Sequence, residues 1–99
     1  MANWRLTINV SNIWKRYEEP FEENPEDEEL FEDFKSEIIP HLQSYISKVQ
    51  FNVNDIDEAG RYSDLLMEME DALDLEEFNE IWNELYNWAD YNRIWIQTM

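Results

Sequence analysis

The sequence has no cysteine, and this absence excludes disulfides, thiolate metal sites and cysteine nucleophiles and is typical of a reducing compartment. Its one histidine, His41, falls at the edge of an apolar helical stripe, which predicts a packing role, and no second His or Cys is present to complete a triad or a zinc site. The first ten residues lack the apolar core of a signal peptide, and no apolar run approaches the about 18 residues of a membrane span. We therefore expect a cytoplasmic protein that does not contact membranes.

Glycine is nearly absent too, and Gly60 alone cannot form a glycine-rich phosphate loop. It lies in a segment that partly resembles the loop of an EF-hand. Asp55, Asp57 and Gly60 stand at loop positions 1, 3 and 6, but Leu66 stands at position 12, where calcium requires a bidentate Glu. We therefore expect no metal and no cofactor. Because the chain also shows no loop-built cleft for paired carboxylates, the sequence predicts a protein that is not an enzyme.

Basic residues are scarce, while acidic residues are abundant. The chain carries 24 Asp and Glu against 7 Lys and Arg, a formal charge of -17 at pH 7. Hydrophobic residues make up 43% and aromatic residues 15%, which indicates a folded domain rather than a disordered acidic tail. With 99 residues, we expect a single acidic domain over residues 1–99. Such a surface repels nucleic acid and anionic lipid, so the expected partners are basic proteins and no direct binding of nucleic acid is expected.

Alternation of apolar and polar residues predicts a strand at each end of the chain. In the first strand the residues expected on the buried face are Trp4, Leu6, Ile8 and Val10. The closing strand covers residues 93–98 and follows a turn predicted at residues 89–92. We expect the two terminal strands to pair in a small sheet. The predicted fold class is therefore α+β, with a helical middle flanked by these strands.

Three main helices and a short one are predicted in the middle of the chain. Ser11 is the expected cap of the short helix, which gives way to a loop at residues 18–23 around Pro20. Asn24 and the proline after it predict the start of the first main helix. Pro40 interrupts its apolar stripe, so we expect a kink or a short break near Glu37.

Two further helix starts follow. Asp55 and Asp74 each precede acidic residues and an apolar stripe at helical spacing, as N-caps do, and the stripe of the Asp55 helix is expected to include Leu73. Between the first two main helices, Val49, Phe51 and Val53 alternate with polar residues, and a short strand is an alternative there.

On each predicted helix the acids fall opposite the apolar face. Carboxylates at i, i+3, i+4 and i+7 lie about 5–6 Å apart along a helix. Phosphates along a nucleic-acid strand are spaced on a similar scale. A solvated helix face usually mixes both signs of charge, but bases are nearly absent here. The residues predicted to bind a partner are Glu22, Glu23, Glu26, Glu29, Glu32, Asp33, Glu37, Asp57, Asp64, Glu68 and Asp71.

These acidic helices resemble, as a class, the small DNA-mimic proteins of phages and mobile elements. Proteins of that class inhibit restriction enzymes (anti-restriction), CRISPR effectors (anti-CRISPR), glycosylases or nucleoid proteins. The resemblance implies a non-enzymatic inhibitor that occupies the basic cleft of a nucleic-acid-binding protein, such as a host-defence nuclease. A phage-encoded protein of this kind would act in the host cytoplasm.

Other functions stay open beside this one. The main alternative is an acidic adaptor or immunity-type protein that binds one basic partner, with Trp95 or Trp14 as an aromatic anchor. An enzyme or a housekeeping domain adapted to high salt is the third hypothesis. The sequence also leaves a homodimer open.

A second, local resemblance covers residues 78–96, which are similar to the second helix and following strand of barstar, the acidic inhibitor of a bacterial ribonuclease. The residues in register are Trp82, Leu85, Trp88, Asp90 and Tyr91. The two aspartates that barstar presents from this helix would correspond to Asn79 and Asn83, so the chain departs from the barstar pattern at the binding positions. The resemblance implies shared architecture over this stretch.

Overall fold

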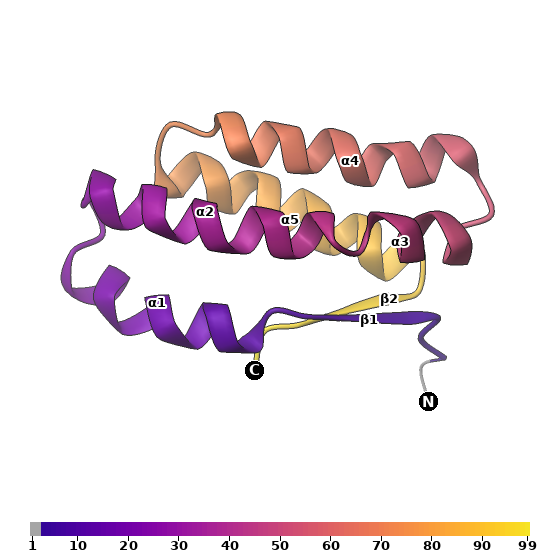
Figure 1. The fold of residues 1–99 in the computed structure, drawn as a ribbon, viewed down its shortest axis with the longest axis horizontal. Helices are drawn as coiled ribbons and strands as arrows, with labels where there is room; N and C mark the ends of the chain where they lie inside the picture. The colour runs from indigo at the N-terminus through magenta and orange to yellow at the C-terminus, as the bar shows by residue number, and fades with distance from the viewer. Residues whose placement is uncertain (1–2) are drawn as a thin grey trace.

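The computed structural model describes residues 3–99, which form five helices between two strands (Figure 1). In chain order the elements are β1 (Leu6–Asn9), α1 (Ser11–Glu23), α2 (Glu28–Gln43), α3 (Ile46–Asn52), α4 (Ile56–Asp71), α5 (Leu75–Tyr91) and β2 (Ile94–Gln97). The two terminal strands pair in parallel, with Leu6 opposite Ile94 and Asn9 opposite Gln97. The predicted α+β class, with a helical middle and paired terminal strands, is therefore confirmed.

The two-stranded sheet buries one face against the helices. Ile8, Ile94 and Ile96 are almost completely buried on this face. Trp4 was expected to join them, but 39% of its surface is exposed and its ring lies 5.4 Å from that of Trp95. The expectation was wrong because Trp4 precedes β1, so the alternation of the strand does not decide where its side chain points.

α1 continues through the segment that was predicted to be a loop. Pro20 lies inside this helix, which ends only at Glu23. The reason is tertiary: the rings of Tyr17 and Phe21 lie 5.3 and 5.4 Å from that of Phe34 on α2, and only continued helical spacing places both there. The helix start also differs, because Val10 is the N-cap and the Ser11 hydroxyl does not cap the helix but donates to the Asn9 side-chain oxygen at 2.7 Å.

α2 begins later than predicted and has no break. Asp27, rather than Asn24, is its N-cap, and the Asp27 carboxylate accepts a hydrogen bond from the Leu30 amide at 3.1 Å. The helix runs through Pro40 to Gln43, so the break expected near residue 37 is absent. Buried side chains on both sides of Pro40, among them Ile39 and Leu42, keep the helical spacing and hold the segment in place.

The segment for which a short strand was an alternative is helix α3. Val49 and Val53 are buried, whereas Phe51 is 85% exposed. In a strand all three residues would share one face, but on a helix residues i and i+4 share a face that residue i+2 does not. The exposure of Phe51 therefore agrees with the helix and excludes the strand.

The caps predicted for the last two helices are confirmed. The Asp55 carboxylate accepts from the amide of Asp57 at 2.9 Å and from that of Glu58 at 3.4 Å. The Asp74 carboxylate accepts from the amide of Glu77 at 2.9 Å. Helix α5 extends to Tyr91 and so includes most of the residues of the turn predicted at 89–92. Arg93, with a φ of 61°, connects the helix to β2.

The order of the helices decides what lies at each end of the molecule. In Figure 1, α1 runs toward the left-hand end, α2 begins there, α4 ends there and α5 begins there. The two connections at this end, residues 24–27 and 72–74, are far apart in the sequence but border one hollow. This end is where the acidic segments meet.

Candidate functional site

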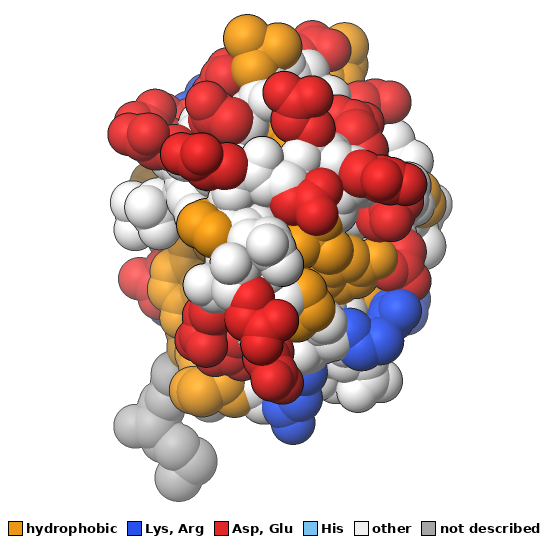
Figure 2. All heavy atoms as spheres, turned by 90° about the vertical axis from the view of Figure 1, so that its left-hand side faces the viewer, with side chains coloured by type: hydrophobic (Ala, Val, Ile, Leu, Met, Phe, Trp, Pro, Cys, Tyr) orange, Lys and Arg blue, Asp and Glu red, His pale blue; other side chains and the backbone are white. Residues whose placement is uncertain are grey.

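The net charge of the protein is concentrated at this end. Residues 18–33 contain ten acids and residues 68–80 contain seven, and neither segment contains Lys or Arg. These segments, called the acidic end below, therefore hold a formal charge of -17, while the remaining 70 residues carry seven acids and seven bases and are neutral in sum. Figure 2 looks onto this end and shows Asp and Glu side chains around an apolar centre.

The carboxylates of the acidic end face solvent. All seventeen acids of the two segments are on exposed residues. Within residues 3–99 the ion pairs are Arg16 with Glu37, at 2.8 Å, and Lys35 with Glu32, at 3.4 Å. Among residues 3–99, Glu32 is thus the one acid of the acidic end in an ion pair, while the carboxylates of Asp27, Asp74 and Glu77 accept hydrogen bonds from backbone amides and still face solvent.

Eight of the eleven residues predicted to bind a partner lie in the acidic end: Glu22, Glu23, Glu26, Glu29, Glu32, Asp33, Glu68 and Asp71. Asp64 lies in the middle of α4, and Asp57 lies in its first turn, about 21 Å from Asp71 at 1.5 Å per residue. The structure therefore does not bring Asp57 to the other residues. Except for half-buried Glu37, the acids expected in rows along α2 and α4 are exposed, and the acids are densest in a cluster where four helix ends meet.

Glu37 also lies outside the cluster, in a contact between α1 and α2. Its carboxylate accepts hydrogen bonds from the Tyr17 hydroxyl and from the Arg16 guanidinium. These bonds hold the pKa of Glu37 below its usual value. Burial, together with the hydrogen bond to Glu37, raises the pKa of Tyr17 to about 12. Glu37 thus stabilises the packing of two helices and is not free to contact a partner through an unpaired carboxylate.

Sequence reasoning missed several acids that the structure places in the acidic end: Glu18, Glu19, Asp27, Glu28, Glu70, Asp74, Glu76, Glu77 and Glu80. Several were recognisable as helix caps or first-turn acids, which stabilise the positive end of a helix dipole. Because α2 and α5 both begin at this end, their capping acids add to the cluster.

A buried lysine holds the two segments of the acidic end together. Lys35 of α2 is 9% exposed, and its Nζ donates to the carbonyl oxygens of Glu70 at 3.1 Å and Ala72 at 2.9 Å. The amine also lies 4.7 Å from the ring centre of Phe31. α4 has no basic residue in its own last turn, so Lys35 supplies the cation that the negative end of this helix favours.

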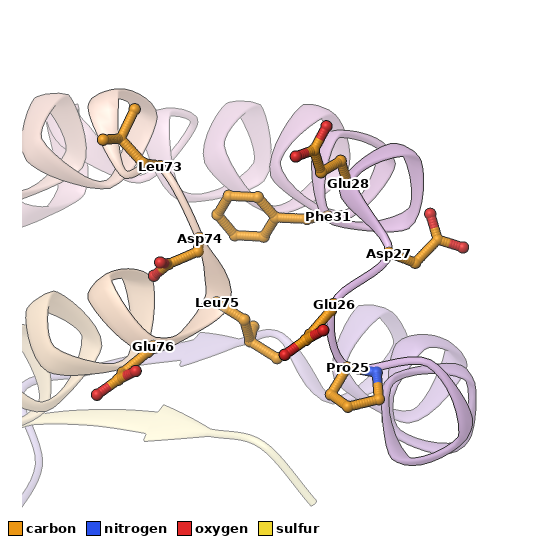
Figure 3. Close-up of a pocket in the computed structure, with 9 residues that line it drawn as sticks. All are labelled: Pro25, Glu26, Asp27, Glu28, Phe31, Leu73, Asp74, Leu75 and Glu76. Carbon is orange, nitrogen blue, oxygen red and sulfur yellow. The ribbon is translucent and has the colours of Figure 1, made fainter.

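A groove lined by both apolar and acidic side chains runs through the acidic end. Its main hollow, of about 410 Å³, lies between the α1–α2 and α4–α5 connections and is lined by Pro25, Phe31, Leu73 and Leu75, with five carboxylates at its rim (Figure 3). In this view the Phe31 ring points from α2 toward the α4–α5 connection, and Leu75 points toward Pro25. We call this hollow and the two that adjoin it at Leu75 the Leu75 groove.

The adjoining hollows extend the groove along α5 and α1. One, of about 450 Å³, shares Pro25 and Leu75 and continues to Asn83. The other, of about 170 Å³, shares Leu75 and has an aromatic wall made by Trp14, Tyr17, Phe21 and Phe34. Leu73 was expected on the buried stripe of α4, but it lies in the connection beyond the helix and is 84% exposed. It therefore adds an apolar side chain to the groove.

The remaining candidate residues are His41, Trp14 and Trp95, of which the first two pack against neighbouring elements. His41 is half-buried as expected, and its Nε2 donates to the carbonyl oxygen of Asn9 at 2.7 Å. Trp14 is half-buried too, with its ring 4.7 Å from that of Trp82. Trp95 is 38% exposed beside Trp4, on the sheet and outside the acidic end.

Neither a metal cluster nor a membrane span is found in the part of the chain that the structure describes. Residues 3–99 contain no group of three or more His, Cys, Asp or Glu side chains arranged to hold a metal ion. No helix among them combines the length and the apolar character needed to cross a membrane. No protein-family model matches the chain, and neither a curated protein nor a solved structure shows significant similarity to it.

Proposed function

We propose that this protein is a non-enzymatic inhibitor that mimics nucleic acid and occupies the basic cleft of a nucleic-acid-binding protein, such as a host-defence nuclease. The observation that carries the proposal is the location of the charge: the acidic end holds -17, and the rest of the chain is neutral in sum. A cleft lined with Lys and Arg for phosphates also attracts a dense set of carboxylates, so the protein and nucleic acid would compete for it.

The fold supports this proposal through the way it keeps the charge together. Like charges at this density repel each other and destabilise a folded domain, and an even distribution of acids would reduce this cost. Here four helix ends and a single buried lysine hold them close together instead. A concentrated charge produces the strong local field that speeds association with a basic cleft.

The test compares two variants with equal changes in charge. The acidic-end variant carries Glu26→Lys, Glu29→Lys and Asp33→Lys. The control variant carries Asp64→Lys, Glu84→Lys and Asp90→Lys, at exposed acids outside the acidic end. None of these six side chains forms a hydrogen bond or an ion pair within residues 3–99, so both variants are expected to fold.

A partner captured from cell lysate by the wild-type protein is then titrated with labelled nucleic acid. We expect the wild-type protein to displace the nucleic acid. The acidic-end variant should lose at least about tenfold in affinity, mainly through slower association, while the control variant loses much less. If nucleic acid and the protein bind the partner at the same time, or if both variants weaken binding equally, the mimic function is wrong.

The adaptor or immunity-type function is the second candidate, and one observation favours it. Trp95 on β2 and Trp4, just before β1, together expose aromatic surface away from the acidic end. Exposed tryptophans are frequent anchors of protein interfaces. A partner that binds nucleic acid and this protein simultaneously, and that loses affinity for a Trp95→Ala variant but not for the acidic-end variant, would support the adaptor and exclude the mimic.

A further inference from the structure

We propose that the Leu75 groove receives an apolar side chain of the partner, so that the partner's contact segment combines Lys or Arg with a leucine-sized or aromatic residue. The inference rests on the proposed function only in requiring a basic protein as the partner. It adds that recognition depends on an apolar anchor at the centre of the charged surface, which a pure copy of a phosphate backbone would not need.

The apolar residues of the groove are placed and exposed as contact residues are. Leu73 is 84% exposed and Leu75 is half-buried, at the centre of the acidic end. The main hollow of about 410 Å³ lies in the size range of about 300–1,000 Å³ that is usual for sites binding organic groups. Leu75 lines all three hollows, so the groove has an apolar residue at its centre and carboxylates at the rim of its main hollow, as an interface centre with a polar rim does.

The negative charge of the rim selects a basic occupant for the groove. The main hollow is bordered by Glu26, Asp27, Glu28, Asp74 and Glu76, and none of them is in an ion pair within residues 3–99. Nucleic acid, anionic lipid or a second copy of this end would bring like charge to the rim and be repelled. A basic segment instead places Lys or Arg against the carboxylates while its apolar residue leaves water.

Two synthetic peptides of equal positive charge serve as probes. In the first, lysines alternate with leucines, and in the second each leucine is replaced by serine. We expect the leucine peptide to bind about tenfold more tightly, the change that burial of one leucine side chain can supply. Added salt should weaken the binding of both peptides, but the ratio of their affinities should persist, because screening acts on charges and not on the apolar contact.

Leu73→Asn is the decisive variant, and Phe51→Asn is its matched control. Leu73 is 84% and Phe51 85% exposed, so neither change empties the core, and Phe51 lies on α3, at the other end of the molecule (Figure 1). Leu73→Asn should reduce the affinity ratio of the two peptides at least about threefold, whereas Phe51→Asn should leave it unchanged.

The experiments distinguish refutation of the apolar anchor from refutation of the mimic function. A ratio near one for the wild-type protein, or a ratio that Leu73→Asn leaves unchanged, would overturn the apolar anchor. If the acidic-end variant still weakens both peptides in that case, the charged surface retains its role and the groove alone is refuted. Competition with nucleic acid at a captured partner is measured separately, so its absence would overturn the mimic without changing the peptide ratio.

Discussion

Replacing Lys35 with methionine removes the cation that caps the C-terminal end of α4. The methionine has a similar length and apolar stem, so the space beside Phe31 stays filled. The two hydrogen bonds from Nζ to the carbonyl oxygens of Glu70 and Ala72 are lost, and no residue in the last turn of α4 replaces the charge. The connection between α2 and the α4–α5 loop should therefore loosen, and with it the geometry of the acidic end.

The expected loss of stability follows from these contacts. A hydrogen bond to a charged group contributes about 1.5–3 kcal/mol, and the charge at the end of a helix adds up to about 1 kcal/mol. Burial of the ammonium group offsets part of this, because desolvating a charge is unfavourable. We therefore expect a net loss of about 2 kcal/mol in the free energy of unfolding. In a domain of this size that corresponds to a fall of about 8–16 °C in the melting temperature.

The assay is urea and thermal unfolding followed by circular dichroism, with Lys15→Met as the control. Lys15 is exposed on α1, and its loss changes the net charge by the same amount. The control should stay within about 0.5 kcal/mol of the wild-type protein. If Lys35→Met loses no more than Lys15→Met, Lys35 does not fix the end of α4 and this reasoning is wrong.

Two further predictions concern charge. The melting temperature should rise between low salt and about 0.5 M NaCl, because screening relieves repulsion within the acidic end. The rise should be larger for the wild-type protein than for the acidic-end variant. A melting temperature that does not change with salt would contradict a concentrated charge. Glu37→Gln removes a carboxylate whose pKa in the folded protein is lowered by Tyr17 and Arg16. This carboxylate stabilises the folded protein above its unfolded-state pKa, and the stabilisation is lost as the pH falls through the folded-state pKa. In the variant, the free energy of unfolding should therefore depend less on pH in this acid range. Absorbance titration of the same variant should show the pKa of Tyr17 falling from about 12 toward its usual value, and an unchanged pKa would show that Glu37 is not a cause.

The features that sequence reasoning predicted well are local ones. Asp55 and Asp74 were recognised as caps because each carboxylate reaches an amide two or three residues ahead, a distance that the sequence itself defines. The terminal strands were predicted from their alternation, and burial of Ile8, Ile94 and Ile96 agrees with it. The excess of acids over bases and its exposure on helices also required no tertiary information.

The errors have a common origin in distant contacts. Pro20 and Pro40 mark breaks by local rules, but aromatic packing on Phe34 and buried side chains around Pro40 keep both helices continuous. Asn24 was predicted as the cap from the proline that follows it, and only the structure shows that α2 begins after Asp27. Each of these choices depends on a partner that is far away in the chain.

The same distinction between local and distant contacts applies to the candidate site. The sequence by itself determined the amount of charge, its exposure on helices, and the two segments, 18–33 and 68–80, that contain no base. Only the tertiary structure decided that these segments share one end of the molecule, that Asp57 and Glu37 lie outside it, and that Leu73 and Leu75 form a groove at its centre. The physical reason is range: caps and charge patterns act over a few residues, whereas the meeting of four helix ends depends on how the helices pack and on the pairing of the first strand with the last.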